Sequence, residues 1–408
     1  MGKKIKKNFI LGLFIAFLGI VVGAVVWFIL WIMDLGIQGV WTWLPKQLGN
    51  PVWYSLVVCG IGGIFVGLLQ KKYGPCPSEL SKDMADIRAG KRLPYDRLHI
   101  IAICALVPLI FGGSLGPEAG LTGVIAGLCF WLADKFKATY AEVEDLAQMG
   151  IAATLGTLFR APLFGFVNQI EDESGKSRIP KTSKMILYFI AILAGFGIFS
   201  LLSHYLGGGL GMGKFDSVQI GYQEWIVMIP LALIGGLCGI AFHGFGKLTR
   251  WLTRPILDRP VMVLPYTLWA GESQMTEMMT IWKTLPLGIL FATGIVKLFM
   301  IQFCIGTGWR GGNIFPVIFS GVCVGYGIAA MFPGLDPVFC VAVVTAGVAG
   351  AVMRKPLAVV MLLIMCFPVD AIVPMCAGAF VATMLPVPKA FMMIDQERID
   401  QEENSSNH

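Results

Sequence analysis

Charged residues are scarce in this chain. Asp, Glu, Lys and Arg make up 14% of its 408 residues, whereas hydrophobic residues make up 56%. In an ordinary soluble domain about a quarter of the residues are charged. The composition therefore excludes an ordinary soluble domain and indicates a protein that lies largely in lipid.

Patterns that bind metals or carry catalysis are also missing. The ten cysteines are scattered without a C-x-x-C pair, and the four histidines lack metal-ligand spacing. The glycine-rich run at 205–213 lacks the G-K-[ST] ending of a phosphate-binding loop. We therefore expect no metal, no cofactor and no enzyme activity, and we interpret the cysteines as small apolar packing residues.

Long apolar runs are abundant. From Phe9 to Met33 the chain carries no charge, and these roughly 25 residues are enough to cross a bilayer. The run follows "KKIKK", is too long for the apolar part of a signal peptide and precedes no A-x-A cleavage site. We interpret it as a retained first helix.

Basic residues gather at particular places between the apolar runs. Lys71 and Lys72 follow the second run, and Lys247 and Arg250 belong to a basic cluster, whereas the loop at 203–216 holds a single lysine. The positive-inside rule then places the basic loops and both termini in the cytoplasm and the loop at 203–216 outside the cell. We expect a multi-pass protein of the cell inner (plasma) membrane. The net charge of +6 reflects this topology and gives no reason to expect nucleic acid as a partner.

A motif recurs in the two parts of the chain. "GTLFRAPLFGF" at 156–166 and "GAVMRKPLAVV" at 350–360 share G-x-x-x-R-x-P-L, and "GGSLGP" and "GGNIFP" precede them in the same order. Many of the apolar runs are short or interrupted by glycine or proline, which is typical of discontinuous helices in transport proteins. The repetition predicts two homologous halves. Discontinuous helices indicate that the two halves have inverted orientations in the membrane.

These halves give the domain organisation that we expect. A single transmembrane domain covers residues 1–395. Its first repeat spans about 40–206 and its second about 220–395, and a polar cytoplasmic tail follows at 396–408.

The glycine-proline elements suit an anion. Each directly precedes an apolar helix, whose first N–H groups lack internal partners and carry the positive end of the helix dipole. Glycine lets the backbone approach a ligand closely. Several such helix starts that converge near the middle of the membrane bind an anion without a positive side chain.

The ordered motifs resemble those of the CLC family of chloride channels and proton-coupled chloride exchangers, over about residues 50–390. The family's G-x-F-x-P element resembles Gly312–Pro316, its G-[KR]-E-G-P element resembles Gly113–Pro117, and Lys297 in "GIVKLFMIQF" also fits. The resemblance implies an all-α polytopic membrane protein with a CLC-like inverted repeat of tilted, partly re-entrant helices. It also implies a homodimer with one pore per subunit.

The resemblance assigns a central anion site. Backbone N–H groups of Asn313 and Ile314 match the family's anion ligands, and those of Gly312 and Gly74 are expected to join them. Gly74 stands where the family has a serine, and Met392 stands near its pore tyrosine. Both hydroxyl groups are missing here, which implies a site that depends on backbone amides and helix starts.

The gate departs from the family's pattern. Leu115 replaces the family's gating glutamate, and the acid instead follows the proline, as Glu118. Glu118 is interpreted either as a shifted gate or as a carboxylate that only stabilises the start of its own helix. Asp172 matches a proton-relaying glutamate of the family's exchangers, or else belongs to a solvated cluster at a helix end.

Three functions follow from these observations. The first is passive transport of small monovalent anions, such as chloride, through a pore formed by helix starts. The second is proton-coupled anion exchange that uses Glu118 and Asp172. The third is a carrier of another substrate, or a protein that keeps the CLC fold without transport.

Overall fold

The protein is built from helices. The structure is a computed structural model and describes residues 2–51, 53–74, 76–88, 95–136, 140–171, 182–208, 213–253 and 271–388. The elements in these ranges are α1 (Gly2–Gln38), the π-helix η1 (Gly39–Trp43), α2 (Leu44–Gln47), α3 (Tyr54–Tyr73), α4 (Leu80–Arg88), α5 (Leu98–Ile110), α6 (Glu118–Lys135), α7 (Tyr140–Leu158), α8 (Pro162–Ile170), α9 (Thr182–Leu206), α10 (Tyr222–Thr253), α11 (Glu272–Ile281), the 3₁₀ turn η3 (Trp282–Thr284), α12 (Leu287–Gly306), α13 (Ile314–Met331), α14 (Pro337–Met353), α15 (Pro356–Leu363), the 3₁₀ turn η4 (Val369–Ala371) and α16 (Ile372–Met384).

Several helices are long and apolar enough to span a membrane. In the ranges given above there are six such segments, in α1–α2, α3, α9, α10, α12 and α13. The apolar run after the basic N-terminal residues forms one continuous helix, α1. The all-α polytopic membrane fold that the family resemblance implies is confirmed.

Other helices are much too short to span the hydrocarbon core. Helices α8 and α15 contain nine and eight residues, and a membrane-spanning helix needs about 20. Each begins with a proline, Pro162 or Pro356, at its first helical position, where a missing N–H costs nothing. Broken helices are therefore a feature of both halves, as the interrupted apolar runs predict.

The repeated G-x-x-x-R-x-P-L motif takes the same local path twice. Arg160 follows α7 with φ 53°, and Arg354 follows α14 with φ 57°; both lie in the left-handed region that non-glycine residues rarely adopt. Each arginine ends its helix and is followed two residues later by the proline that starts α8 or α15. The two parts of the chain thus share an unusual backbone conformation as well as a motif.

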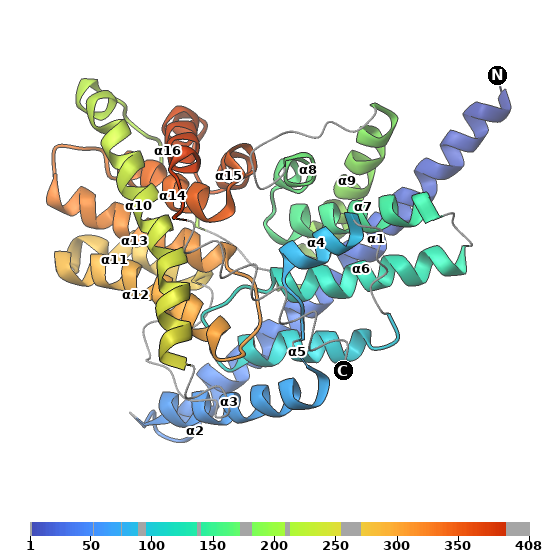
Figure 1. The fold of residues 1–408 in the computed structure, drawn as a ribbon, viewed down its shortest axis with the longest axis horizontal. Helices are drawn as coiled ribbons and strands as arrows, with labels where there is room; N and C mark the ends of the chain where they lie inside the picture. The colour runs from blue at the N-terminus through green and yellow to red at the C-terminus, as the bar shows by residue number, and fades with distance from the viewer. Residues whose placement is uncertain are drawn as a thin grey trace.

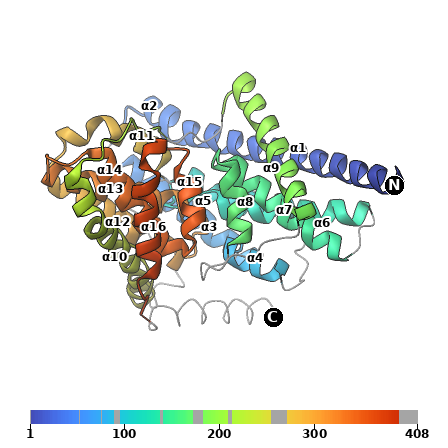
Figure 2. The ribbon, with the colours of Figure 1, turned by 90° about the horizontal axis from the view of Figure 1, so that it is seen from above.

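The two halves lie side by side. Helices α6–α9 gather on one side of the molecule and α10–α16 on the other (Figure 1). The short helices α8 and α15 contact each other between them, which both views show (Figure 2). In the second half, α13 packs against α14 and α12, and 89% of the residues of α13 are buried inside the protein. The start of α13 is thereby held deep in the molecule.

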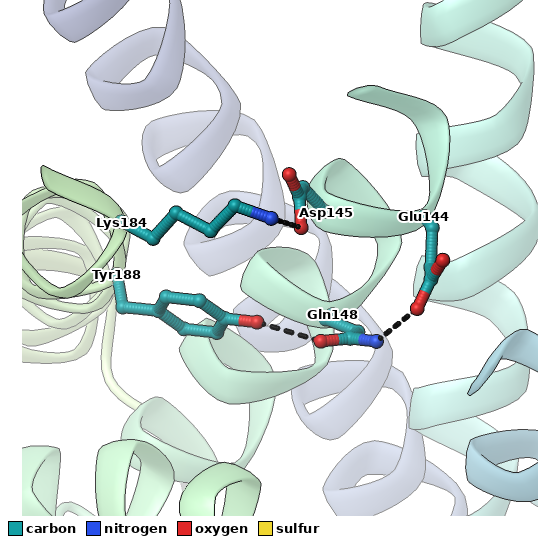
Figure 3. A network of polar contacts seen from close by, with 5 residues as sticks. All are labelled: Glu144, Asp145, Gln148, Lys184 and Tyr188. Carbon is teal, nitrogen blue, oxygen red and sulfur yellow. Dashed lines mark hydrogen bonds and ion pairs between the residues drawn. The ribbon is translucent and has the colours of Figure 1, made fainter. Parts of the chain in front are cut away.

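Polar contacts tie α7 to α9 (Figure 3). The Lys184 ammonium lies 2.7 Å from the Asp145 carboxylate, and the Tyr188 hydroxyl donates to the Gln148 side chain at 2.8 Å. Gln148 donates in turn to Glu144 at 2.9 Å. These contacts hold α9 against the helix that leads to Arg160.

Candidate functional site

The two glycine-proline elements meet at the centre of the protein. Gly116, just before α6, and Gly312, just before α13, form an isolated antiparallel bridge. Each donates its N–H to the other's carbonyl oxygen, and both N···O distances are 2.7 Å. Segments 196 residues apart are therefore joined directly, and the starts of α6 and α13 are neighbours. The sequence predicts this convergence, although not the bridge itself.

Glu118 crosses from one helix start to the other. It is the first residue of α6, yet its Oε1 atom accepts a hydrogen bond from the N–H of Ile314, the first residue of α13, at 2.7 Å. Only 1% of Glu118 is exposed. The Glu118 carboxylate thus lies at the positive end of the α13 dipole.

The bridge glycines leave room for this carboxylate. A Cβ atom on Gly116 would lie 2.0 Å from Glu118 Oε2, and one on Gly312 would lie 1.9 Å from Glu118 Cδ. Both distances are far below any real contact, so a side chain at either position displaces the carboxylate. The glycines of both halves therefore form a cradle for one acid.

The start of α13 has the chemistry of an anion site, and the Glu118 carboxylate occupies that site. Three features meet there: an N–H group at a helix start, the helix dipole and a bound negative group. The carboxylate oxygen stands in for an anion. The Gly312 N–H is already engaged in the bridge, and Asn313 directly precedes the helix and accepts from Val317 N at 3.1 Å.

Two other predicted residues are engaged in contacts of their own. Gly74 ends α3 with φ 73°, and its N–H donates to the Gln70 carbonyl at 2.9 Å, so that group is engaged within the helix end. Leu115 is fully buried in the apolar core beside Gly311. At position 115, where the family resemblance implies a gating glutamate, this chain thus has a leucine that packs in the core.

Met392 and Asp172 lie outside the described residues. The neighbour of Asp172, Glu171, is described and was missed by the sequence analysis. It is 1% exposed, and its carboxylate accepts from the N–H groups of Leu357 at 3.2 Å and Ala358 at 2.8 Å. An acid at the end of α8 therefore holds the start of α15, in the other half. The run "EDES" signals only an acidic cluster, and the sequence does not show which member turns inward.

Arg310 and Asp83 are two further charged groups of the first half and of the segment before α13. The Arg310 guanidinium lies 3.9 Å from the Glu79 carboxylate. Asp83, on the polar helix α4, is 1% exposed and accepts a hydrogen bond from the Ser78 hydroxyl. Burial, the largest influence, raises the pKa of Asp83 to about 6, against the lowering effect of the Ser78 hydrogen bond.

Comparison with known proteins identifies a family. The family model described as "Voltage gated chloride channel" matches residues 62–386. The "Putative ion-transport protein YfeO" of Shigella sonnei is 23% identical, with 88% of each chain covered, and that of Escherichia coli O9:H4 is equally similar.

Solved structures show the same fold. The crystal structure of a CLC-type fluoride/proton antiporter matches with a TM-score of 0.74 at 20% identity, over 93% of this chain and 95% of that one. The structure of a slow cyanobacterial Cl⁻/H⁺ antiporter matches with a TM-score of 0.74 at 18% identity, over 96% and 98%. At these identities the likeness concerns the fold alone.

Proposed function

The chain belongs to the voltage-gated chloride channel family, and we propose that it carries small monovalent anions, such as chloride, passively across a membrane. The pathway passes the start of α13, between the two halves. Neither Asn313 nor Ile314 needs a particular side chain for this role, because the backbone N–H groups bind the anion.

One observation carries the proposal. A buried carboxylate, Glu118, lies 2.7 Å from the Ile314 amide nitrogen, in the place where an anion binds at a helix start. A group that binds one negative oxygen at this depth binds another negative species once the carboxylate leaves. The charge of that species is matched by the helix dipole, and so a monovalent anion suits it.

Glu118 then acts as the gate. While its carboxylate is ionised and bound to Ile314, it competes with the anion for the same N–H group. Protonation removes its charge and weakens that hydrogen bond. Glu118 lies three positions after Leu115, where the family has its gating glutamate. Its carboxylate can therefore block the path although position 115 carries no acid. This favours the shifted gate over a carboxylate that only stabilises its own helix.

A flux assay tests the function. Purified protein in liposomes loaded with chloride is diluted into chloride-free buffer, and chloride efflux and internal pH are recorded together. Passive transport predicts efflux once a potassium ionophore balances the charge, with no uphill proton movement. No flux of chloride, bromide, nitrate or fluoride would refute the proposal and favour a carrier of another substrate or a non-transporting member of the fold.

Proton-coupled exchange is the second candidate, and Glu118 is also the observation that favours it. A titratable group in the anion path can carry a proton when the anion is absent. Asp172 is the acid proposed to pass that proton onward. The two structural neighbours are described as antiporters. Chloride efflux that drives protons uphill in the same assay decides for exchange.

The setting of the protein is part of the proposal. We place it in the inner (plasma) membrane with both termini in the cytoplasm, because the basic loops cluster on one side of the predicted topology. We also propose a homodimer with one pathway per subunit. Cross-linking in native membranes and the accessibility of terminal tags test these two statements.

A further inference from the structure

A cavity lies next to the gate. Its volume is about 60 Å³, and its lining includes Phe159, Arg160, Lys214, Phe315 and Cys366. One water needs about 10–15 Å³ by the same measure, so this cavity has room for a small anion with part of its hydration shell. Arg160 follows α7, Lys214 belongs to the segment between α9 and α10, and Phe315 is the second residue of α13.

The cavity is positively charged. Arg160 and Lys214 both line it, and no acidic side chain does so among the residues that the structure describes. Arg160 is half-buried and Lys214 is exposed. Two cations that share one cavity repel each other, and an anion between them removes this repulsion.

The two arginines of the repeated motif end their helices in the same way but have different surroundings. Arg354 has the same left-handed backbone as Arg160, and the Arg354 guanidinium donates to the Leu385 carbonyl at 2.9 Å, beside the end of α16. Arg160 instead lines the cavity. The same motif position thus has a structural contact in one half and belongs to a cavity wall in the other.

The cavity adjoins the anion pathway. Phe315 forms part of its wall and directly follows Ile314, whose N–H binds Glu118. The rings of Phe159 and Phe315 stack with centroids 4.4 Å apart. An anion in the cavity is therefore separated from the gate by one residue of α13 and one aromatic pair.

We propose that this cavity is a second anion site, an antechamber in which Arg160 and Lys214 hold a small monovalent inorganic anion before it reaches α13. This inference rests on the proposed transport function. The loop that carries Lys214 is the one predicted to lie outside the cell, so the antechamber serves the outer mouth. Its ligands are charged side chains, whereas the site at α13 uses backbone amides, and so only the antechamber depends strongly on ionic strength.

Neutralising the antechamber tests the proposal. Bromide uptake into liposomes is measured against bromide concentration for wild type, Lys214→Gln, Arg160→Gln and Lys214→Arg. We expect each glutamine variant to raise the half-saturating concentration about threefold at low ionic strength, because positive charge at a mouth concentrates anions. The rate at saturating bromide stays near that of wild type. Lys214→Arg, which keeps the charge, behaves as wild type.

Two features separate an electrostatic site from a damaged fold. The threefold difference disappears when an impermeant salt such as sodium gluconate is raised to about 0.5 M, where the Debye length is only a few ångströms. Lys135→Gln removes an exposed charge at the far end of α6, and it leaves the half-saturating concentration unchanged. Bromide soaked into wild-type crystals gives an anomalous peak between Arg160 and Lys214.

The outcomes distinguish the two proposals. Wild-type protein that carries no small anion refutes the transport function and the antechamber with it. Active variants whose half-saturating concentration equals that of wild type refute the antechamber alone. Absence of bromide between the two cations in an active protein also refutes it.

Discussion

The Oε1 atom of Glu118 lies 2.7 Å from the amide nitrogen of Ile314, although 196 residues separate the two positions. Each is the first residue of its helix and lies two positions after a glycine of the Gly116–Gly312 bridge. The first helix supplies an acid at this place and the second supplies an isoleucine. One carboxylate therefore spans both helix starts.

Glu118→Gln is expected to preserve anion flux and abolish its dependence on pH. In wild type, efflux rises as the medium becomes acidic, because the protonated carboxyl releases the Ile314 amide. Glutamine is neutral at every pH and competes weakly. Initial chloride efflux between pH 4.5 and 7.5 checks this, with Glu79→Gln as the control that keeps the pH dependence. Complete loss of flux in a folded Glu118→Gln protein would contradict the gating role.

Gly312→Ala is expected to destabilise the protein through a single contact. The new Cβ atom would meet Glu118 Cδ at 1.9 Å, and overpacking of this kind costs about 1–3 kcal/mol. Adding Glu118→Ala removes the carboxylate that the new Cβ atom meets. The double variant should therefore recover much of the lost stability. Thermal unfolding in detergent measures this coupling. Gly197→Ala, which meets nothing within 4 Å, serves as the control.

If Gly312→Ala stays equally unstable after Glu118→Ala is added, the glycine is needed for the backbone conformation of the bridge and not for making room for the Glu118 carboxylate. The same comparison applies to Gly116→Ala.

Glu171→Gln is expected to loosen the contact between α8 and α15. The amide NH₂ of glutamine faces N–H groups that an ionised carboxylate satisfied, and a buried donor without an acceptor costs about 1–3 kcal/mol. The midpoint of thermal unfolding should fall, whereas that of the exposed control Glu277→Gln should not. An unchanged midpoint for Glu171→Gln means that these hydrogen bonds do not stabilise the fold.

Asp83→Asn is expected to stabilise the protein at high pH. Because burial raises the pKa of Asp83 to about 6, its contribution to stability is complete below the ordinary value near 3.8 and is lost as the pH rises through 6. Asparagine keeps a partner for Ser78 and carries no charge. The gain at pH 8 is on the order of 1 kcal/mol and vanishes at pH 4. Unfolding midpoints at the two pH values test it, and an equal gain at both would contradict it.

Much of the fold follows from the sequence because its signals are local. Apolar runs report membrane helices, and the recurring arginine-proline motif reports the repeat, since Arg160 and Arg354 impose the same helix end. Glycine and proline in or just before the first turns of α6 and α13 mark the starts of these helices. Helix starts of this kind are what a local pattern can report of an anion site.

The remaining features are tertiary, and local patterns do not specify them. The sequence left open whether Glu118 serves its own helix or a gate, because the direction of a side chain in the first turn depends on what packs beside it. The cradle of Gly116 and Gly312 decides that direction. Similarly, Arg160 and Lys214 are 54 positions apart, and only the approach of the α9–α10 segment to α13 places them at one cavity.

The reciprocal pair of hydrogen bonds between Gly116 and Gly312 restricts how the molecule can work. A rocking motion, in which one half tilts away from the other to expose the substrate alternately, has to break both of these bonds in each cycle. Breaking buried backbone bonds costs roughly 1–3 kcal/mol for each group left without a partner. Rotation of the Glu118 side chain leaves both bonds intact. The two helix starts can therefore stay joined while an anion takes the proposed path beside them.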